Sequence, residues 1–205
     1  MIGLLKMPIA NLQSAWNALY ENGHDSVLVD ENFDFDELTH LIVPGVGNFR
    51  AVMDNLAERG LPEKIRAFAA SKRPLLGICV GMQLLATWGA ESGPTDGLGL
   101  VPGKVVKLVE NGELRLPHVG WNTVTVRRPH PVFDGIKPQR DFYFVHSYGF
   151  QPDNDEDWLG EATYGRAFAC VVARDNVVGF QFHPEKSQVN GIKLLENFCH
   201  WDGKC

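Results

Sequence analysis

The first half of the chain alternates short apolar runs with amphipathic segments, and this alternation limits the possible folds more than any other feature. Buried strands are predicted at 2–5, 26–29, 41–43 and 74–78. A helix is predicted after the first strand, where apolar residues recur at helical spacing at Leu12, Ala15, Trp16 and Leu19. Two more helices are expected between the last two strands, one of them beginning near Pro62. This order predicts an α/β fold, an open, mixed and mostly parallel sheet with helices on both faces.

The second half has a different pattern, in which β-branched and aromatic runs are separated by Gly, Pro and Asn. Strands are predicted at 104–108, 123–127, 142–146, 168–173 and 177–182. We expect them to add an antiparallel extension to the sheet, followed by a closing helix from about 190 to 200. The acidic run 153–157 is expected to be solvated surface. No repeat or linker interrupts the 205 residues, which are predicted to form a single domain, 1–205.

Charge and cysteine usage argue against several classes of function. The chain has 19 Lys and Arg against 25 Asp and Glu, a net charge of −6, and no basic tract, so no nucleic-acid partner is expected. No apolar run has the length of a membrane span, and the first residues lack the features of a signal peptide, so we expect a cytoplasmic protein without membrane contact. Four cysteines without CxxC spacing favour reduced thiols, and neither a metal nor a cofactor is expected.

A cysteine between glycines stands at a predicted junction of strand and helix. The segment Gly77-Ile78-Cys79-Val80-Gly81 has the layout of a nucleophile elbow, in which glycines permit a sharp turn and a close approach of substrate. A thiol at a helix N-terminus is favoured as the thiolate, the form that attacks a carbonyl carbon. For a lone cysteine a buried structural role is the alternative interpretation.

A candidate base follows the last predicted strand. His183 comes directly after 177–182, and Glu185 lies two positions on, where its carboxylate can orient the imidazole. A surface histidine beside an incidental acid is the alternative for this pair taken alone. Parallel strands place their carboxyl ends at one edge of a sheet, so Cys79 and His183 are expected to meet there.

Thiol attack builds negative charge on the substrate oxygen, and this charge needs amide donors. The Val80 amide is one candidate donor, and Pro44-Gly45-Val46-Gly47, after strand 41–43, can supply a second. An ordinary strand-ending turn is the alternative for the latter segment. Together these features predict acyl transfer through a thioester.

Several segments resemble the class I glutamine amidotransferases and, within them, the glutaminase subunits of imidazole glycerol phosphate synthase. The matching segments are 44–47, 76–85, 117–122, 143–148 and 180–187. The second and last of these are typical of the class, whereas PHVGWN at 117–122 and YFVHSY at 143–148 point to this subunit. The resemblance implies a flavodoxin-like fold.

The resemblance also implies roles for individual residues. Cys79 would attack the side-chain amide of L-glutamine, His183 would protonate the leaving ammonia and Glu185 would orient His183. The positions that match the family's oxyanion site are Val46, Gly47 and Val80. The positions that match its substrate site are Gln83, Glu91, His146, Ser147 and Tyr148. From the residues alone, a helix-surface glutamine and a loop acid remain the simpler interpretations of Gln83 and Glu91.

In this family the ammonia passes to a (β/α)₈-barrel cyclase, with which the glutaminase forms a heterodimer. The cyclase combines it with a phosphoribulosyl aminoimidazole carboxamide nucleotide to make imidazole glycerol phosphate for histidine synthesis. The positions that match the docking face are Asn11, Pro117, Trp121, Tyr143 and Lys186. A core tryptophan that caps a hairpin is the alternative for Trp121. Without the loaded partner, the strand 45–47 is expected to hold its amide turned away from the site.

Some residues depart from the family pattern. Lys6 stands where an acid is common, and Met7-Pro8 occupies a glycine turn near the docking face. This leaves open a paralogous glutaminase that supplies ammonia for amidino groups on surface sugars. Cysteine peptidases and chaperones that share the elbow usually have a histidine directly after the nucleophile, where Val80 stands here. A non-catalytic binding subunit is a further alternative, against which the three filled triad positions count.

Overall fold

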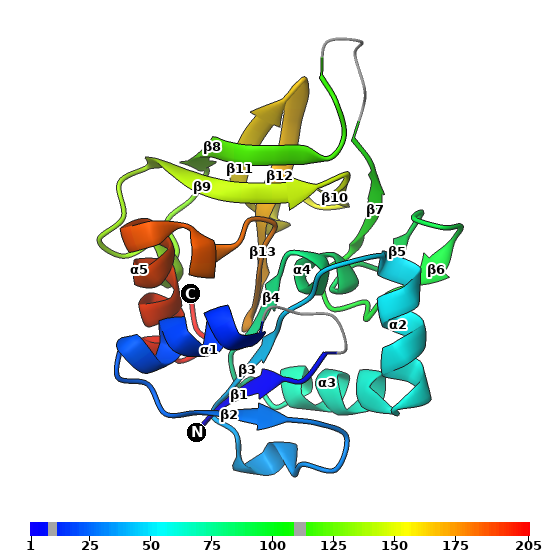
Figure 1. The fold of residues 1–205 in the computed structure, drawn as a ribbon, viewed down its shortest axis with the longest axis vertical. Helices are drawn as coiled ribbons and strands as arrows, with labels where there is room; N and C mark the ends of the chain where they lie inside the picture. Colours follow the sequence, from blue (N-terminus) through cyan, green and yellow to red (C-terminus); the bar gives the residue numbers. More distant parts are fainter. Residues whose placement is uncertain (8–11, 109–113) are drawn as a thin grey trace.

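A computed structural model describes residues 1–7, 12–108 and 114–205 (Figure 1). Asn11, one of the expected docking residues, and Pro8, in the atypical N-terminal segment, lie outside the described residues. No helix in the described part of the chain is long and apolar enough to cross a membrane.

The parallel strands form one continuous half of the sheet. In spatial order they are β2 (Ser26–Val29), β1 (Ile2–Leu5), β3 (His40–Val43), β4 (Leu75–Ile78) and β13 (Val177–Phe180). Every residue of β1, β4 and β13 is buried, which is why these strands have continuous apolar sequences rather than alternating ones. Both faces of this half must therefore be covered.

Helices cover the two faces. Their bounds are α1 (Leu12–Glu21), α2 (Phe49–Glu58), α3 (Leu61–Ala70) and α5 (Gln188–His200). Figure 1 shows α1 and α5 on one side of the parallel strands and α2 and α3 on the other. The expected α/β fold with an open mixed sheet and helices on both faces is confirmed. The closing helix begins at Gln188, two residues before the expected start, after the 3₁₀ turn η4 (Pro184–Lys186).

The antiparallel half is larger than the sequence predicts. Beyond β13 the sheet continues through β12 (Arg166–Arg174), β10 (Tyr148–Pro152), β7 (Gly103–Lys107), β5 (Trp88–Gly89) and β6 (Thr95–Asp96). A branch from β12 consists of β11 (Trp158–Tyr164), β8 (His118–Val126) and β9 (Gln139–His146). Sequence analysis missed β5, β6, β10 and β11 and began β8 five residues too late, at 123. Short strands and the irregular register around Gly160 weaken the alternation on which such predictions depend.

The acidic run 153–157 is only partly the solvated surface that the sequence predicts. Asp157 is 5% exposed, and its carboxylate oxygen Oδ2 accepts hydrogen bonds from Arg174 at 3.1 Å and Asn154 at 3.2 Å. The expectation was wrong for this residue because Arg174, on β12, supplies a cation that allows the carboxylate to be buried.

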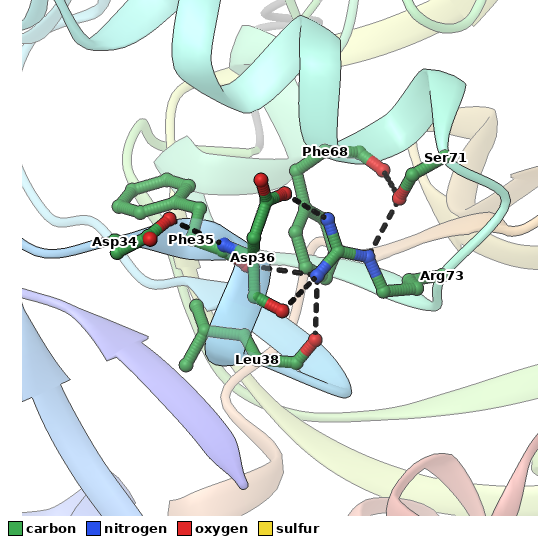
Figure 2. A network of polar contacts seen from close by, with 7 residues as sticks. All are labelled: Asp34, Phe35, Asp36, Leu38, Phe68, Ser71 and Arg73. Atoms are coloured by element: carbon green, nitrogen blue, oxygen red, sulfur yellow. Dashed lines mark hydrogen bonds and ion pairs between the residues drawn. The ribbon is translucent and has the colours of Figure 1, made fainter.

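Arg73, which precedes β4, attaches the 3₁₀ turn Phe35–Glu37 to the end of α3 (Figure 2). Its guanidinium donates hydrogen bonds to the carbonyl oxygens of Phe35 at 2.8 Å and Leu38 at 2.7 Å. The same group lies over the Phe68 ring, 4.4 Å from its centre. These contacts hold the start of β4, the strand whose far end carries Cys79.

Candidate active site

Cys79 lies at a sharp turn between β4 and the one-turn helix α4 (Val80–Leu84). Its φ of 55° and ψ of −111° are unusual for any residue with a side chain. The neighbouring glycines are required by close approach, since a Cβ on Gly81 would stand 1.8 Å from the Val43 carbonyl oxygen. A Cβ on Gly77 would stand 2.5 Å from the Gly81 carbonyl oxygen. Strained backbone held in place by its surroundings is typical of a nucleophile elbow.

The helix after the elbow ends at Leu84, after little more than one turn. The carbonyl oxygen of Leu84 accepts the amide of Leu98, and that of Leu85 accepts the amides of Leu100 and Val101. Loop amides therefore satisfy the carbonyl groups that a longer helix would have used.

The sheet brings the predicted nucleophile and base together. Strands β4 and β13 are parallel neighbours with Ile78 opposite Phe180, so Cys79 and His183 both follow at the same edge. Two residues, Gln181 and Phe182, separate His183 from the end of β13, whereas the sequence predicted direct succession.

His183 and Glu185 form a buried pair. His183 Nδ1 is 2.7 Å from Glu185 Oε1, and the two side chains are 3% and 5% exposed. Burial by itself lowers the pKa of His183, but the interactions of the ring with Cys79 and Glu185, including the charges of both, outweigh it and raise this pKa to about 9. The other ring nitrogen, Nε2, is buried without a hydrogen-bond partner among the described residues. Nε2 is therefore the ring nitrogen that remains available to the Cys79 thiol.

The backbone of His183 is attached to β9. Its amide donates to the Tyr143 carbonyl oxygen at 2.9 Å, and its carbonyl oxygen accepts the Ser187 hydroxyl at 2.6 Å. That hydroxyl also accepts the Tyr143 amide at 3.0 Å. The base is therefore held by β9 as well as by β13.

A cavity of about 200 Å³ opens beside Cys79. It is lined by Val46, Gly47, Cys79, Val80, Gln83, Glu91, Val145, His146, Ser147 and Tyr148. Every residue that the sequence predicts for the oxyanion and substrate sites is among them. Val145 was not predicted, and its carbonyl oxygen lies 3.9 Å from Cys79 Sγ.

Gln83 is buried rather than a helix-surface residue. It is 3% exposed, and its Nε2 donates to the Tyr148 carbonyl oxygen and to Gln181 Oε1, both at 3.0 Å. Sequence analysis missed Gln181, although its place in the segment before His183 was a signal. Glu91 is half-buried, and its Oε2 accepts the Phe49 amide at 2.7 Å at the start of α2. Glu91 thus has a structural contact with one oxygen while it lines the cavity.

The predicted oxyanion donors are not both free. The Val80 amide donates to the Gly45 carbonyl oxygen at 3.3 Å. Gly47 has a φ of 111°, a conformation that favours glycine. The segment after β3 thus lies against the elbow, and its Gly45 carbonyl occupies the Val80 amide.

The predicted docking residues that the structure describes lie on or beside β8 and β9. Trp121 is 49% exposed, which is inconsistent with a core tryptophan, and it pairs across the strands with Tyr143. Their rings meet edge to face at 6.1 Å. Pro117 and Lys186 are exposed, and Val119, 56% exposed, was not predicted.

His146, predicted as a substrate residue, has both ring nitrogens engaged. Nδ1 lies 2.8 Å from the Tyr148 carbonyl oxygen, and Nε2 lies 3.0 Å from His118 Nδ1. His118 and its contact Asn122 belong to the PHVGWN segment, but sequence analysis gave them no role. Among the residues described, no group of three or more His, Cys, Asp or Glu side chains is arranged to hold a metal.

The family model "Glutamine amidotransferase class-I" matches residues 9–201. The chain belongs to the class-I glutamine amidotransferases. This amidotransferase is 45% identical over 203 residues to imidazole glycerol phosphate synthase subunit HisH of Sulfurimonas denitrificans, covering 97% of each chain. It is 40% identical over 208 residues to subunit HisH 2 of Nitrobacter winogradskyi, covering 98% of each. The solved structure of PurLQS from Thermotoga maritima shares the fold, with a TM-score of 0.75 at 18% identity over 97% of both chains.

Proposed function

We propose that this amidotransferase is the glutaminase subunit of an imidazole glycerol phosphate synthase and acts in histidine biosynthesis as one domain over residues 1–205. The observation that carries the proposal is its 45% identity over nearly the full length to a protein named as that subunit. The cavity beside Cys79 supports the glutaminase chemistry, because a nucleophile, a base and predicted substrate residues meet there.

The proposed reaction has two steps. The Cys79 thiolate attacks the side-chain amide carbon of glutamine, and protonated His183 gives its proton to the departing nitrogen, which leaves as ammonia. His183 then takes a proton from water as that water attacks the glutamyl thioester. Glutamate leaves, and the Cys79 thiolate is restored. Glu185 orients the imidazole through its 2.7 Å contact and stabilises its charged form.

The oxyanion of each tetrahedral intermediate is proposed to bind the Val46 and Val80 amides. The Val80 amide must first be released from the Gly45 carbonyl oxygen, to which it now donates. Rotation of the peptide between Gly45 and Val46 would free it and turn the Val46 amide toward Cys79. This rotation changes ψ of residue 45 and φ of residue 46, and Gly45, which has no Cβ, provides conformational freedom for it.

The rest of the cavity is proposed to hold the amino-acid end of glutamine. Glu91 Oε1 is the oxygen not engaged by the Phe49 amide and suits the α-ammonium group. Ser147 and Tyr148 also line the cavity and suit the α-carboxylate.

The proposed partner is a (β/α)₈-barrel cyclase that forms a heterodimer with this chain. Ammonia in water at neutral pH is mostly protonated and unreactive, so direct transfer into the partner preserves the nucleophile. Exposed Trp121 and Val119 suit anchors in such an interface, and Lys186 is an exposed cation at its edge. A cytoplasmic location is proposed with this role, because four free cysteines suit a reducing compartment.

Glutamate release by the purified protein tests the proposal, measured alone and with the barrel cyclase of the same genome loaded with its nucleotide. We expect strong stimulation by the loaded cyclase and no activity in Cys79→Ala. Glutamate release that is equal with and without this cyclase would overturn the histidine role and favour an ammonia donor for amidino-sugar synthesis. Absence of activity in every condition would overturn the glutaminase role and favour a binding subunit.

A further inference from the structure

A line of hydrogen bonds joins β8 to the wall of the cavity through the half-buried Asn122 and two buried imidazoles. Asn122 Nδ2 lies 3.3 Å from His118 Nε2, and His118 Nδ1 lies 3.0 Å from His146 Nε2. His146 Nδ1 then lies 2.8 Å from the Tyr148 carbonyl oxygen. We call these three side chains and this carbonyl the imidazole chain. Its two rings are 3% and 6% exposed.

The last acceptor sets the direction of the imidazole chain. A carbonyl oxygen only accepts, so His146 Nδ1 must carry a hydrogen, and the Nε2 atom of the neutral ring must accept. His118 Nδ1 therefore donates to it, and His118 Nε2 accepts from the Asn122 amide group. Burial lowers the pKa of His118 to about 4 and, as the largest influence, that of His146 to about 3, so both rings are neutral at neutral pH.

Aromatic neighbours hold both rings in place. His118 lies between the rings of Tyr164 and Phe144, with centres 4.1 Å and 5.0 Å away and nearly parallel planes. His146 packs against Phe168 at 5.1 Å. Neither ring can turn without displacing these neighbours, so the hydrogen bonds of the imidazole chain keep one geometry.

The imidazole chain begins on the inner side of the strand whose outer side is proposed to meet the partner. Successive side chains of a strand point to opposite faces. His118 is buried and Asn122 donates to the Thr163 carbonyl oxygen on β11, whereas Val119 and Trp121 point outward and are 56% and 49% exposed. A shift of β8 under contact on its outer side therefore moves His118 and Asn122 as well.

At its other end the imidazole chain reaches Gln83, which lies one helical turn after Cys79. The Tyr148 carbonyl oxygen accepts from His146 and also from Gln83 Nε2. The second hydrogen of that Nε2 goes to Gln181, so Oε1 is the amide atom that Gln83 offers to the cavity. The place of the Tyr148 carbonyl therefore determines how Gln83 is presented to a ligand.

We propose that His118 and His146 are positioning residues, which fix the places of the Tyr148 carbonyl and the Gln83 amide. Through the same hydrogen bonds, a displacement of β8 is transmitted to the cavity. His146 has no free nitrogen for glutamine and acts through Tyr148. The positioning itself requires only the geometry described here, whereas its control by a docked partner rests on the proposed function.

Two substitutions of His118 separate hydrogen bonding from packing. His118→Phe keeps a ring between Tyr164 and Phe144 but removes the donor to His146, whereas His118→Asn keeps a donor near the Nδ1 position and loses the ring. We expect KM for glutamine to rise roughly 2- to 10-fold in His118→Phe, the size of one neutral hydrogen bond, and His118→Asn to stay nearer the wild type. Thr125→Val, on the outer side of β8, is the control that stays unchanged. A larger rise of KM in His118→Asn than in His118→Phe would overturn the proposal.

Nitrogen NMR of the imidazoles gives a readout independent of activity. We expect His118 and His146 to be neutral with the hydrogen on Nδ1, which is the less common form of free imidazole. His118→Phe should alter the His146 Nε2 signal, since that atom loses its donor. A hydrogen on Nε2 of either ring would overturn the imidazole chain, whether or not the protein is a glutaminase.

The partner-dependent part is tested with the loaded barrel cyclase. We expect His118→Phe to lower the stimulation of glutamate release roughly 2- to 10-fold, again the size of one hydrogen bond, with Kd for the cyclase unchanged. Equal stimulation in wild type and variant would overturn the transmission. If the cyclase fails to bind the wild type, the proposed function and this transmission both fail. The NMR and KM results then still decide the positioning.

Discussion

The carbonyl oxygen of Gly45 accepts a hydrogen bond from the amide of Val80 at 3.3 Å. In a planar trans peptide the C=O and the following N–H point in opposite directions, so the Val46 N–H faces away from Val80. One predicted oxyanion donor is therefore occupied, and the other is turned away from it.

Covalent capture of Cys79 tests this rotation. We expect a chloromethyl-ketone analogue of glutamine to alkylate Cys79 and to shift the amide NMR signals of Val46 and Val80 together. The ketone oxygen then replaces the Gly45 carbonyl oxygen as their acceptor. The Gly99 amide, which donates to Ala86, is the reference and should not move. An unchanged Val46 signal in the alkylated protein would contradict the rotation.

Glu185→Gln is expected to lower kcat for glutaminase at least about tenfold with little change in KM, because the amide neither fixes the His183 tautomer nor stabilises the imidazolium. The measurement is the rate of glutamate release across glutamine concentrations. Glu196→Gln is a matched control on α5, where the carboxylate pairs with Lys193 at the surface. Equal loss in both variants would count against the orienting role.

The raised pKa of His183 predicts how stability depends on pH. Although burial opposes it, contact with Cys79 and Glu185 raises this pKa from 6.5 to about 9. The charged ring therefore contributes stability that is fully present below pH 6.5 and is lost as the pH rises through about 9. We expect the free energy of unfolding to differ most between wild type and Glu185→Gln at low pH. In urea titrations at several pH values, a difference that grows toward pH 9 would contradict this assignment.

Gly81→Ala is expected to destabilise the fold by about 3 kcal/mol or more, because backbone surrounds the added methyl group and cannot yield. The nearest atom, the Val43 carbonyl oxygen, would lie 1.8 Å from the new Cβ. Gly23→Ala is the control, with open space and a φ of 75°, and should cost about 1 to 2 kcal/mol through strain alone. Urea unfolding measures both, and similar costs would refute the close-approach argument.

Trp121→Ala is expected to weaken binding of the barrel cyclase by about 2 kcal/mol, roughly 30-fold in Kd, since a half-exposed aromatic side chain suits an interface anchor. Leu28→Ala is the control, because Leu28 is 38% exposed on the edge strand β2. Titration calorimetry gives both values. Unchanged affinity in Trp121→Ala would place the docking surface elsewhere.

Sequence analysis succeeded where a local pattern has one physical solution. An apolar strand, a cysteine between glycines and a helix start predict the elbow, because few backbone paths join them. It was least successful in the antiparallel half, where the two-residue strand β5 and the irregular β11 have almost no periodicity. The apparent surface acid Asp157 is buried only because Arg174 lies beside it.

The sequence by itself determined the succession of strands and helices in the first half of the chain, the elbow at Cys79 and the candidate pair His183 and Glu185. These depend on short-range spacing and backbone sterics. Only the tertiary structure decided that Gln83 is buried against Gln181, 98 positions away, and that His118 donates to His146, 28 positions away. Hydrogen bonds of this kind form when segments from distant parts of the chain pack together. No local pattern of residues predicts which distant segments will do so.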